Sequence, residues 1–200
     1  ATQDARTCGT TASLCGIEKG LYEGDEGQVA LGIRRDLMMH AAVMCMAGFP
    51  MLSSGDEIGQ LNGYGYHDDP ILREDSRNLH RTPFSWDNAA RRTMPGTVQQ
   101  RLWDGLRQLE KLRAGQPCFG PGAWVTTWDT HNNSVLAIVR RTGDETMACL
   151  FNFSGLAQTV WLDGLEGEFS DLISGERACC PSGTLGPYQY QLCLGRKSGC

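Results

Sequence analysis

The sequence predicts a mixed architecture, in which an α/β segment is followed by an all-β segment folded as an antiparallel β-sandwich. In the first part, stretches with helical spacing of apolar residues flank one short apolar run that suits a buried parallel strand. After residue 116 the helical spacing stops, and short β-rich runs alternate with turn clusters. We therefore expect two domains in this chain of 200 residues, residues 1–115 and residues 116–200.

The helices of the first domain are predicted from caps and apolar stripes. They span residues 9–20, 28–47 and 98–114. Thr10 or Thr11 can cap the first helix, and Gly20 is expected to stop it. The second should end at Gly48, with its continuously apolar last turns buried. The third has a leucine every three or four residues along one face, which is typical of an amphipathic helix.

A short apolar run, Phe49–Ser53, follows the second helix and predicts a buried parallel strand. Such a strand needs neighbours on both sides, and residues 1–115 offer no second strand of this kind. We therefore expect its partners to come from another polypeptide. The next stretch, residues 55–87, is polar and without periodicity, which is typical of a functional or a disordered loop.

The second domain is predicted from period-two patterns of β-branched and aromatic residues. The expected strands cover residues 124–128, 134–140, 146–153, 158–162, 168–172 and 188–194. Turn clusters separate them, among them Pro181-Ser182-Gly183. This spacing of short strands favours an antiparallel sandwich.

Composition excludes several classes of protein. A net charge of −5 without a basic block argues against nucleic-acid binding. The longest apolar stretch, Ala41–Leu52, contains Gly48 and Pro50 and is too short to span a bilayer. The first residues are polar, with no visible signal peptide and no initiator Met, so we expect a piece of a longer cytoplasmic protein.

Nine cysteines raise the alternative of a secreted, disulfide-linked protein. Their number is odd, and Cys45, Cys149 and Cys193 lie in runs that look like core, so reduced thiols are favoured. The pair Cys179-Cys180 and the terminal Cys200 fit that interpretation least well. Neither a CxxC nor an HxxxH pattern occurs, so a metal site is not expected.

Three motifs in order resemble one enzyme family. Gly48-Phe49-Pro50-Met51-Leu52-Ser53-Ser54-Gly55-Asp56-Glu57-Ile58-Gly59 resembles the last barrel strand of the α-amylase superfamily (glycoside hydrolase family 13), with Ser53 at the usual aromatic position. Residues 74–81 and Phe84-Ser85-Trp86 resemble the stretch that follows this strand. Residues 4–14, DARTCGTTASL, resemble a segment of amylosucrases. The chain thus looks like the C-terminal portion of an amylosucrase-like protein.

The resemblance implies that residues 1–115 are the last βα unit and flanking helices of a (β/α)8 TIM barrel, completed by a companion polypeptide. Such enzymes are retaining and use two carboxylates about 5 Å apart. In the family these carboxylates and a third follow strands four, five and seven, which would precede Ala1, so we expect no catalytic residue here and no activity of the chain alone. The implied substrate is sucrose or an α-glucan, without a cofactor. Trehalose synthase, oligo-glucosidase and sucrose phosphorylase types are alternatives.

Two arginines are the candidate substrate-binding residues. By resemblance, Arg6 helps to form the acceptor subsite, and Arg77 helps to close the glucosyl pocket through an ion pair with an upstream acid. A guanidinium suits both tasks because it presents a rigid fork of donors. The alternative is a solvated surface arginine. For Gly55, Asp56 and Glu57 we expect a structural role in the last barrel strand, with the carboxylates bonding loop amides, since adjacent strand residues face opposite sides.

Aromatic residues raise further hypotheses. Tyr64 and Tyr66 suit stacking on sugar rings or packing within the loop, and His67-Asp68-Asp69 is expected to be a solvated loop segment. Three tryptophans of the second domain are expected to be core: Trp124, Trp128 and Trp161. The rival hypothesis is a carbohydrate-binding β-sandwich module, which solvent-facing indoles would favour.

Overall fold

The computed structural model describes residues 8–143, 145–165, 167–178 and 182–196. These residues form two compact units. The first unit contains residues 8–36 and 52–104, and the second contains residues 37–51 together with those from 105 onward. The helices α3 (Glu26–Cys45) and α5 (Val98–Gly115) contribute residues to both units. The domain boundary at residues 115 and 116 remains a prediction.

The helix expected over residues 9–20 is divided in two. Thr10 caps α1 (Thr11–Leu14) as predicted, because its hydroxyl accepts a hydrogen bond from the Ser13 amide at 3.3 Å. Gly16, with φ of 88°, then separates α1 from α2 (Ile17–Glu23). The prediction that Gly20 stops the helix is wrong. A Cβ at Gly20 would lie 2.7 Å from the Val29 amide nitrogen, so this glycine serves close packing of α2 on α3.

The loop after α3 contains only short helical turns, as the lack of periodicity indicated. They are η1 (Asp56–Ile58), η2 (Tyr64–Asp68), η3 (Leu72–Glu74), η4 (Ser76–Leu79), α4 (Trp86–Ala90) and η5 (Arg91–Thr93). The buried amide of Gln60 anchors both ends of this stretch. Its Nε2 donates to the Thr82 carbonyl at 3.2 Å, and its Oε1 accepts from the Ser85 amide at 3.2 Å.

The buried strand predicted at Phe49–Ser53 is absent. These residues form no ladder, and the side chains of Phe49 and Met51 are 99% and 87% exposed. The physical reason is the lack of pairing partners. A parallel strand must pair with neighbours, and every described strand of this chain lies after residue 123.

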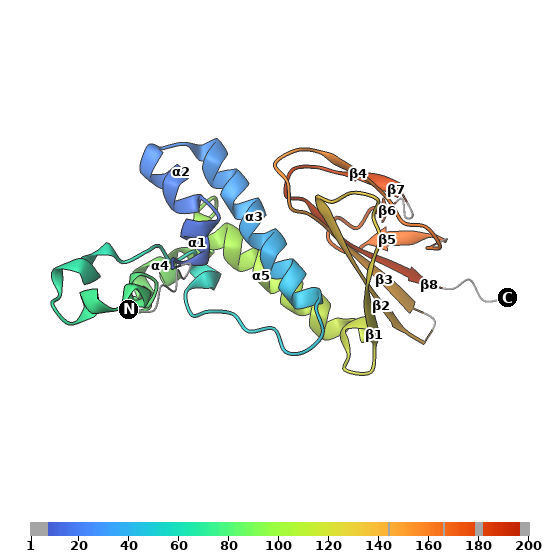
Figure 1. Cartoon of the computed structure of the whole chain (residues 1–200), viewed down its shortest axis with the longest axis horizontal. Helices are drawn as coiled ribbons and strands as arrows, with labels where there is room; N and C mark the ends of the chain where they lie inside the picture. The colour runs from blue at the N-terminus through green and yellow to red at the C-terminus, as the bar shows by residue number, and fades with distance from the viewer. Residues whose placement is uncertain (1–7, 144, 166, 179–181, 197–200) are drawn as a thin grey trace. The chain divides into compact units, whose positions relative to one another are not determined.

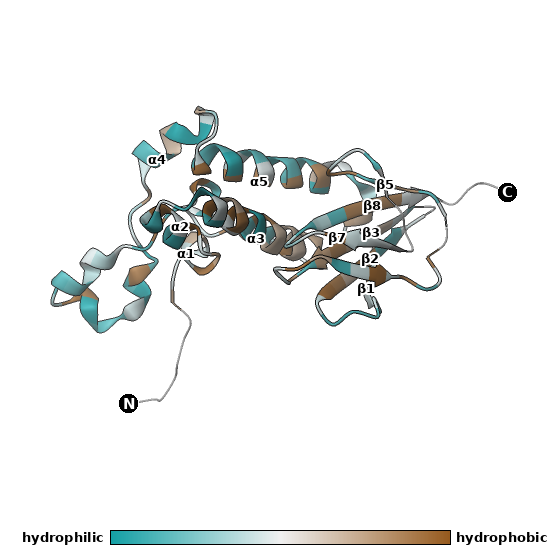
Figure 2. Cartoon of the chain, turned by 90° about the horizontal axis from the view of Figure 1, so that it is seen from above, coloured by the Kyte–Doolittle hydropathy of each residue, from teal (hydrophilic) through white to brown (hydrophobic). Residues whose placement is uncertain are grey.

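The helices α3 and α5 have the boundaries expected from their apolar spacing, within two residues. Along α5 the leucines Leu102, Leu106 and Leu109 are buried, and Figure 2 shows hydrophobic and hydrophilic residues on different sides of this helix. A short turn, η6 (Pro117–Phe119), follows and leads into the β-rich segment.

The β-rich segment consists of two antiparallel sheets (Figure 1). The first has the strand order β1-β2-β3-β8-β5-β6, and the second pairs β4 with β7. The strands are β1 (Trp124–Trp128), β2 (Val135–Thr142), β3 (Glu145–Asn152), β4 (Gln158–Trp161), β5 (Phe169–Asp171), β6 (Arg177–Ala178), β7 (Ser182–Leu185) and β8 (Tyr190–Arg196). The six predicted strands are all present, within two residues at each end.

Two strands were not predicted. The cluster Pro181-Ser182-Gly183 was expected to be a turn, yet Ser182 and Gly183 belong to β7, which pairs with β4. Residue 181 lies outside the described residues. In this pairing Ser182 lies in register with Trp161, and Gly183 with Val160.

The central strands β2 and β3 are buried on both faces. One face packs under β4 and β7 in a core made of Val135, Ala137, Val139, Ala148, Leu150, Val160, Leu162, Leu165, Phe169, Leu185 and Cys193. The other face carries Ile138, Met147, Cys149 and Phe151, all buried. On that second face the side chain of Cys149 forms a hydrogen bond with that of Cys45, so the C-terminal end of α3 lies against Cys149.

The C-terminus of α3 is capped by two arginines. Arg140, only 3% exposed, donates from Nη1 to the Cys45 carbonyl at 2.9 Å and from Nε to the Cys118 carbonyl at 2.6 Å. Arg113 donates to the Met44 carbonyl and, at 2.7 Å, to that of Gly48. Both guanidinium groups also lie over the Phe119 ring, at 5.3 and 5.7 Å. Positive charge here satisfies carbonyls that the helix itself leaves without partners.

In the described part of the chain, no helix is both long enough and apolar enough to cross a bilayer.

Candidate functional site

The candidate arginine that the structure describes, Arg77, lies at η4 and is exposed. Asp75 caps this turn and holds the guanidinium in a forked pair, with Nη2–Oδ2 of 2.6 Å and Nε–Oδ1 of 2.8 Å. Hydrogen bonds from Arg77 lower the pKa of the Asp75 carboxyl, and this partner raises the pKa of Arg77. Arg77 is thus oriented by a local acid, whereas the resemblance implied an acid upstream. Arg6 lies outside the described residues.

The carboxylates of Asp56 and Glu57 accept hydrogen bonds from backbone amides. The Asp56 carboxylate accepts from the Ser53 amide at 3.1 Å, and that of Glu57 accepts from the Gly55 amide at 2.9 Å. Gly55 has φ of 103°, which only glycine adopts readily. Together these contacts shape η1. Their place in a last barrel strand remains a prediction.

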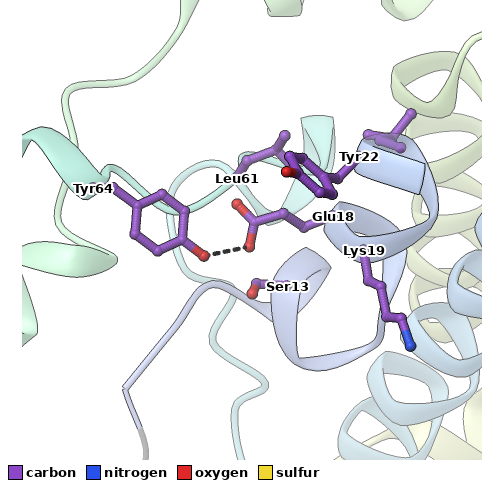
Figure 3. A pocket seen from close by; sticks show the side chains of 7 residues that line it. Ser13, Glu18, Lys19, Tyr22, Leu61 and Tyr64 are labelled. Atoms are coloured by element: carbon purple, nitrogen blue, oxygen red, sulfur yellow. Dashed lines mark hydrogen bonds between the residues drawn. The ribbon is translucent and has the colours of Figure 1, made fainter. Parts of the chain in front are cut away.

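A pocket of about 660 Å³ opens beside α2 (Figure 3). It is lined by Ser13, Glu18, Lys19, Leu21, Tyr22, Leu61 and Tyr64. The hydroxyl of Tyr64 donates to Glu18 Oε2 at 3.1 Å, and Figure 3 shows the Lys19 amine directed away from this carboxylate. The side chain of Tyr22 is 93% exposed at the rim.

Glu18 is the centre of a network that fixes the loop on the helices. Its two oxygens accept from the Asn62 amide and from Asn62 Nδ2, both at 3.1 Å. Asn62 Nδ2 also contacts Ser13 Oγ at 2.9 Å, and its Oδ1 accepts from the Thr10 amide at 2.8 Å. With its oxygens occupied by these donors, Glu18 positions the loop that carries Tyr64. Sequence reasoning found Tyr64 and missed Glu18 and Asn62, which are 44 residues apart.

The segment His67-Asp68-Asp69 is a loop segment, as expected. Asp69 accepts from the amides of Ile71 and Leu72, at 2.7 and 3.1 Å, and His67 lies against the Tyr66 ring. Among the described residues, no group of three or more His, Cys, Asp and Glu side chains is arranged to hold a metal ion.

The tryptophans of the β-rich segment are divided between core and surface. Trp128 packs at the edge of the core, as predicted. The core prediction is wrong for Trp124 and Trp161, whose side chains are 52% and 53% exposed. Trp124 is on the same face of β1 as Trp128 and lies at the end of the strand, and Trp161 is on the outward side of β4, since its neighbour Val160 is buried. Two solvent-facing indoles are the observation that favours a sugar-binding surface.

An ion pair adjoins these indoles. His131 Nε2 lies 2.9 Å from Asp163 Oδ2, and Asp163 Oδ1 accepts from the indole nitrogen of Trp161. The hydrogen bond to Asp163, followed by the charge of Asp129, raises the pKa of His131 above 6.5, and the same bond lowers the pKa of Asp163.

We expect the imidazole resonances of His131 to titrate above pH 6.5 in NMR, and Asp163→Asn to lower the midpoint. Because the folded pKa is raised, the contribution of this pair to stability is full below the unfolded value and is lost as pH rises through the folded one. Asp129→Asn should lower the midpoint less, since it removes only the second cause. An equal or larger effect of Asp129→Asn would contradict this ranking.

Each of the six described cysteines is a thiol and forms no disulfide: Cys8, Cys15, Cys45, Cys118, Cys149 and Cys193. The core positions predicted for Cys45, Cys149 and Cys193 are confirmed, and their reduced state in the cell remains a prediction. Cys179, Cys180 and Cys200 lie outside the described residues. Burial raises the pKa of Cys15 to about 12 and also raises that of Cys118 and Cys149, which makes them poor nucleophiles at neutral pH.

Thiol titration checks this distribution. After denaturation without reductant, we expect most of the nine cysteines to react. In the native protein, Cys8 should react faster than the five buried thiols, because only it is partly accessible among the six. Recovery of one thiol or fewer after denaturation would instead indicate a disulfide-bonded protein.

Comparison with known proteins places the β-rich segment. Residues 125–192 match the family model described as the maltogenic amylase C-terminal domain. We call residues 125–192 the maltogenic-amylase-type domain, after the model that they match. The α-amylase-family resemblance of the sequence is thereby confirmed, whereas the amylosucrase subgroup remains a prediction.

Solved structures share the fold of the maltogenic-amylase-type domain and of the residues before it. AmyP in complex with maltose is 21% identical, with a TM-score of 0.65, and the match covers 84% of this chain and 36% of AmyP. The trehalose-6-phosphate hydrolase of Bacillus licheniformis is 18% identical, with a TM-score of 0.63 and coverage of 82% and 39%. A trehalulose synthase, MUTB, is 19% identical, with a TM-score of 0.60 and coverage of 81% and 38%.

The chain therefore spans 36% to 39% of the length of these three structures. The antiparallel C-terminal domain that the sequence predicted is confirmed. The (β/α)8 barrel and the sandwich packing of the C-terminal sheets remain predictions.

Proposed function

We propose that this chain is the C-terminal part of a retaining, α-glucan-active enzyme of the amylosucrase type. The complete enzyme would transfer or hydrolyse the glucosyl unit of sucrose or an α-glucoside. The order of two features carries the proposal. The motif Gly48–Gly59 is followed, after a loop and one amphipathic helix, by a maltogenic-amylase-type domain.

The names of the structural relatives support an α-glucosidic substrate. AmyP has been crystallised with maltose and with maltotriose, and other relatives are a trehalose-6-phosphate hydrolase and a trehalulose synthase. These enzymes differ in substrate and product. They support an α-glucoside as the substrate, and they do not distinguish transfer of the glucosyl unit from its hydrolysis.

The proposed chemistry divides between this chain and the rest of the barrel. A carboxylate from the barrel attacks the anomeric carbon, forming a bond from C1 to the carboxylate oxygen while the glycosidic C1–O bond breaks. A second carboxyl group gives its proton to the leaving oxygen. It then takes a proton from the incoming hydroxyl or water, whose oxygen bonds to C1 while the bond from C1 to the first carboxylate breaks. This chain contributes the loop of residues 55–87, on which Arg77 faces the glucosyl unit, and Arg6 at the acceptor side.

The Asp75–Arg77 pair bears on how Arg77 works in the complete enzyme. Its forked geometry fixes the guanidinium plane before any sugar arrives. Both groups are exposed here, so the pair contributes little to folding stability. Asp75 occupies Nε and one N–H of Nη2, and the role we assign to the pair is to orient the remaining Nη donors toward sugar hydroxyls.

Assays of the purified chain test the division of labour. The chain alone should show no turnover of sucrose, maltose or starch above the buffer control, because the proposed nucleophile and acid are on the other part. Intact-mass analysis must first show that no longer polypeptide is present. Turnover by material that passes this check would overturn the proposal.

A further inference from the structure

Aromatic and polar side chains linked by pairwise contacts lie on the surface of the β-rich segment. We define the tryptophan strip as Trp124, Arg141, Trp128, Asp163, Trp161 and His131. The guanidinium of Arg141 lies between the first two indoles, 5.4 Å from the Trp124 ring and 5.2 Å from that of Trp128. Arg141 is also the register partner of Trp124 on the neighbouring strand β2.

Asp163 joins the second half of the strip to the first. Its backbone carbonyl accepts from the indole nitrogen of Trp128 at 2.8 Å, and its carboxylate accepts from that of Trp161. The second carboxylate oxygen pairs with His131 at 2.9 Å. Two strands of different sheets, β1 and β4, are thus connected through one residue in the turn after β4.

The rings of the strip are held in place before any ligand binds. The indole nitrogens of Trp128 and Trp161 have fixed partners, and Trp128 is wedged against the core. The ring of Trp124 is contacted by the Arg141 guanidinium. An immobilised aromatic surface loses little conformational entropy on binding. Trp124 and Trp161 nevertheless leave about half of their surface open, at 52% and 53%. Exposed indoles would be costly without a function or a cover.

The polar groups show what kind of ligand fits. A pyranose ring has an apolar face of C–H groups, which packs on an indole, and a rim of hydroxyls, which needs donors and acceptors close to that indole. The strip supplies both, since a guanidinium, a carboxylate and an imidazole alternate with the rings. Next to Trp161 on the outward face of β4, the hydroxyls of Thr159 and Thr184 lie 3.3 Å apart and exposed.

We propose that the tryptophan strip is a sugar-binding surface for a linear α-glucan, separate from the loop that carries Arg77. The choice of α-glucan rests on the proposed function, whereas the site itself rests on the geometry of the strip. Trp124 and Trp161 stack on glucosyl units, and Arg141 and Asp163 bind hydroxyl groups at the ring edges. The domain would hold a polymeric substrate near the enzyme without taking part in the chemistry.

Calorimetry on this chain with maltoheptaose tests the proposal, because binding at the strip needs no complete barrel. Trp161→Ala and Trp124→Ala should each weaken binding by about tenfold, as removal of an aromatic anchor does. Trp161→Phe should lie between, since it keeps a ring and loses the indole nitrogen. Trp86→Ala is the matched control, because Trp86 is 78% exposed and belongs to the first unit.

NMR gives a second readout that does not depend on affinity. The indole N–H signals of Trp128 and Trp161 report on Asp163 and should shift on titration with maltoheptaose, whereas that of Trp86 should stay. Unchanged thermal unfolding of the variants shows that loss of binding is not loss of fold.

Each outcome decides a different point. Absence of binding to maltoheptaose and to soluble starch overturns the strip as a sugar site. Binding that both strip variants leave unchanged does the same, because the sugar then lies elsewhere. The chain could instead bind cellohexaose tightly and not maltoheptaose, with binding lost in the strip variants. That result would support the sugar site, and it would contradict both the α-glucan class and the proposed function. Protection of the strip by another polypeptide and not by any sugar would assign it to a protein interface and overturn the proposal.

Discussion

Replacing Arg140 with methionine should lower the free energy of unfolding by about 2–4 kcal/mol. Methionine fills most of the volume of the arginine stem, so a cavity is not the main cost. The loss arises at the carbonyls of Cys45 and Cys118, which accept from the guanidinium at 2.9 and 2.6 Å. Both would remain buried without a donor, and the C-terminus of α3 would lose a compensating positive charge.

This case differs from a buried ion pair, whose replacement by apolar residues is often neutral. When a buried ion pair is replaced, both charged groups are removed together. When Arg140 is replaced, the backbone carbonyls that accept its hydrogen bonds remain. Arg140→Lys should recover part of the loss, because an ammonium can reach one carbonyl but does not span two as the fork does. Burial, the first cause, and the nearby charge of Arg113 lower the pKa of Arg140, which indicates that this charge is held at a cost and used for bonding.

Thermal unfolding followed by circular dichroism checks the size of the effect. A loss of this magnitude should reduce Tm by about 5–15 °C in a chain of 200 residues. Arg107→Met is the control, because Arg107 is exposed and pairs with Glu110 on the surface of α5. That change should cost no more than about 0.5 kcal/mol. A loss below about 1 kcal/mol for Arg140→Met would show that water or a rearranged side chain satisfies the two carbonyls.

The elements that could be predicted from sequence are those whose signal is local. Antiparallel strands such as β2 and β3 alternate side chains within a few residues, and their partners lie next to them in the chain. The leucine face of α5 and the Thr10 cap are likewise local. Strand β7 was missed because Ser182 and Gly183 are typical of turns and are paired here only through β4.

The features that escaped prediction depend on contacts distant in sequence. Arg140 sits within an apolar strand, and nothing nearby in the sequence shows that its partner is the end of α3, 95 residues away. The hydrogen bonds between Asn62 and Glu18 escaped prediction likewise, because 44 residues separate the two. Trp124 and Trp161 were expected in the core because strand tryptophans commonly pack there, but Trp124 lies in the first position of β1 and Trp161 on the outward side of β4, and both are half exposed.

Adding the part of the barrel that the proposal requires should have the largest effect of all, from no turnover to measurable turnover of sucrose. The segment Phe49–Ser53 supplies the structural reason. Its residues form no ladder, and Phe49 and Met51 are almost fully exposed. Docking between neighbouring parallel strands would pair the backbone and bury both side chains. Burial of each side chain should stabilise the assembly by about 1.5–3 kcal/mol.

Co-expression of this chain with a polypeptide that carries the preceding barrel strands provides the measurement. Glucosyl transfer from sucrose should appear only in the co-purified pair, and hydrogen exchange at residues 49–53 should slow by roughly a thousandfold on assembly. Phe49→Asp should abolish both effects, because a charge in a doubly covered strand lacks a partner. Met94→Asp, a change of the same kind at a side chain that is 53% exposed, should leave both intact. The pair could also assemble and turn over sucrose while the amides of residues 49–53 still exchange freely. That result would show that these residues are not a strand of the barrel and that the activity does not depend on them.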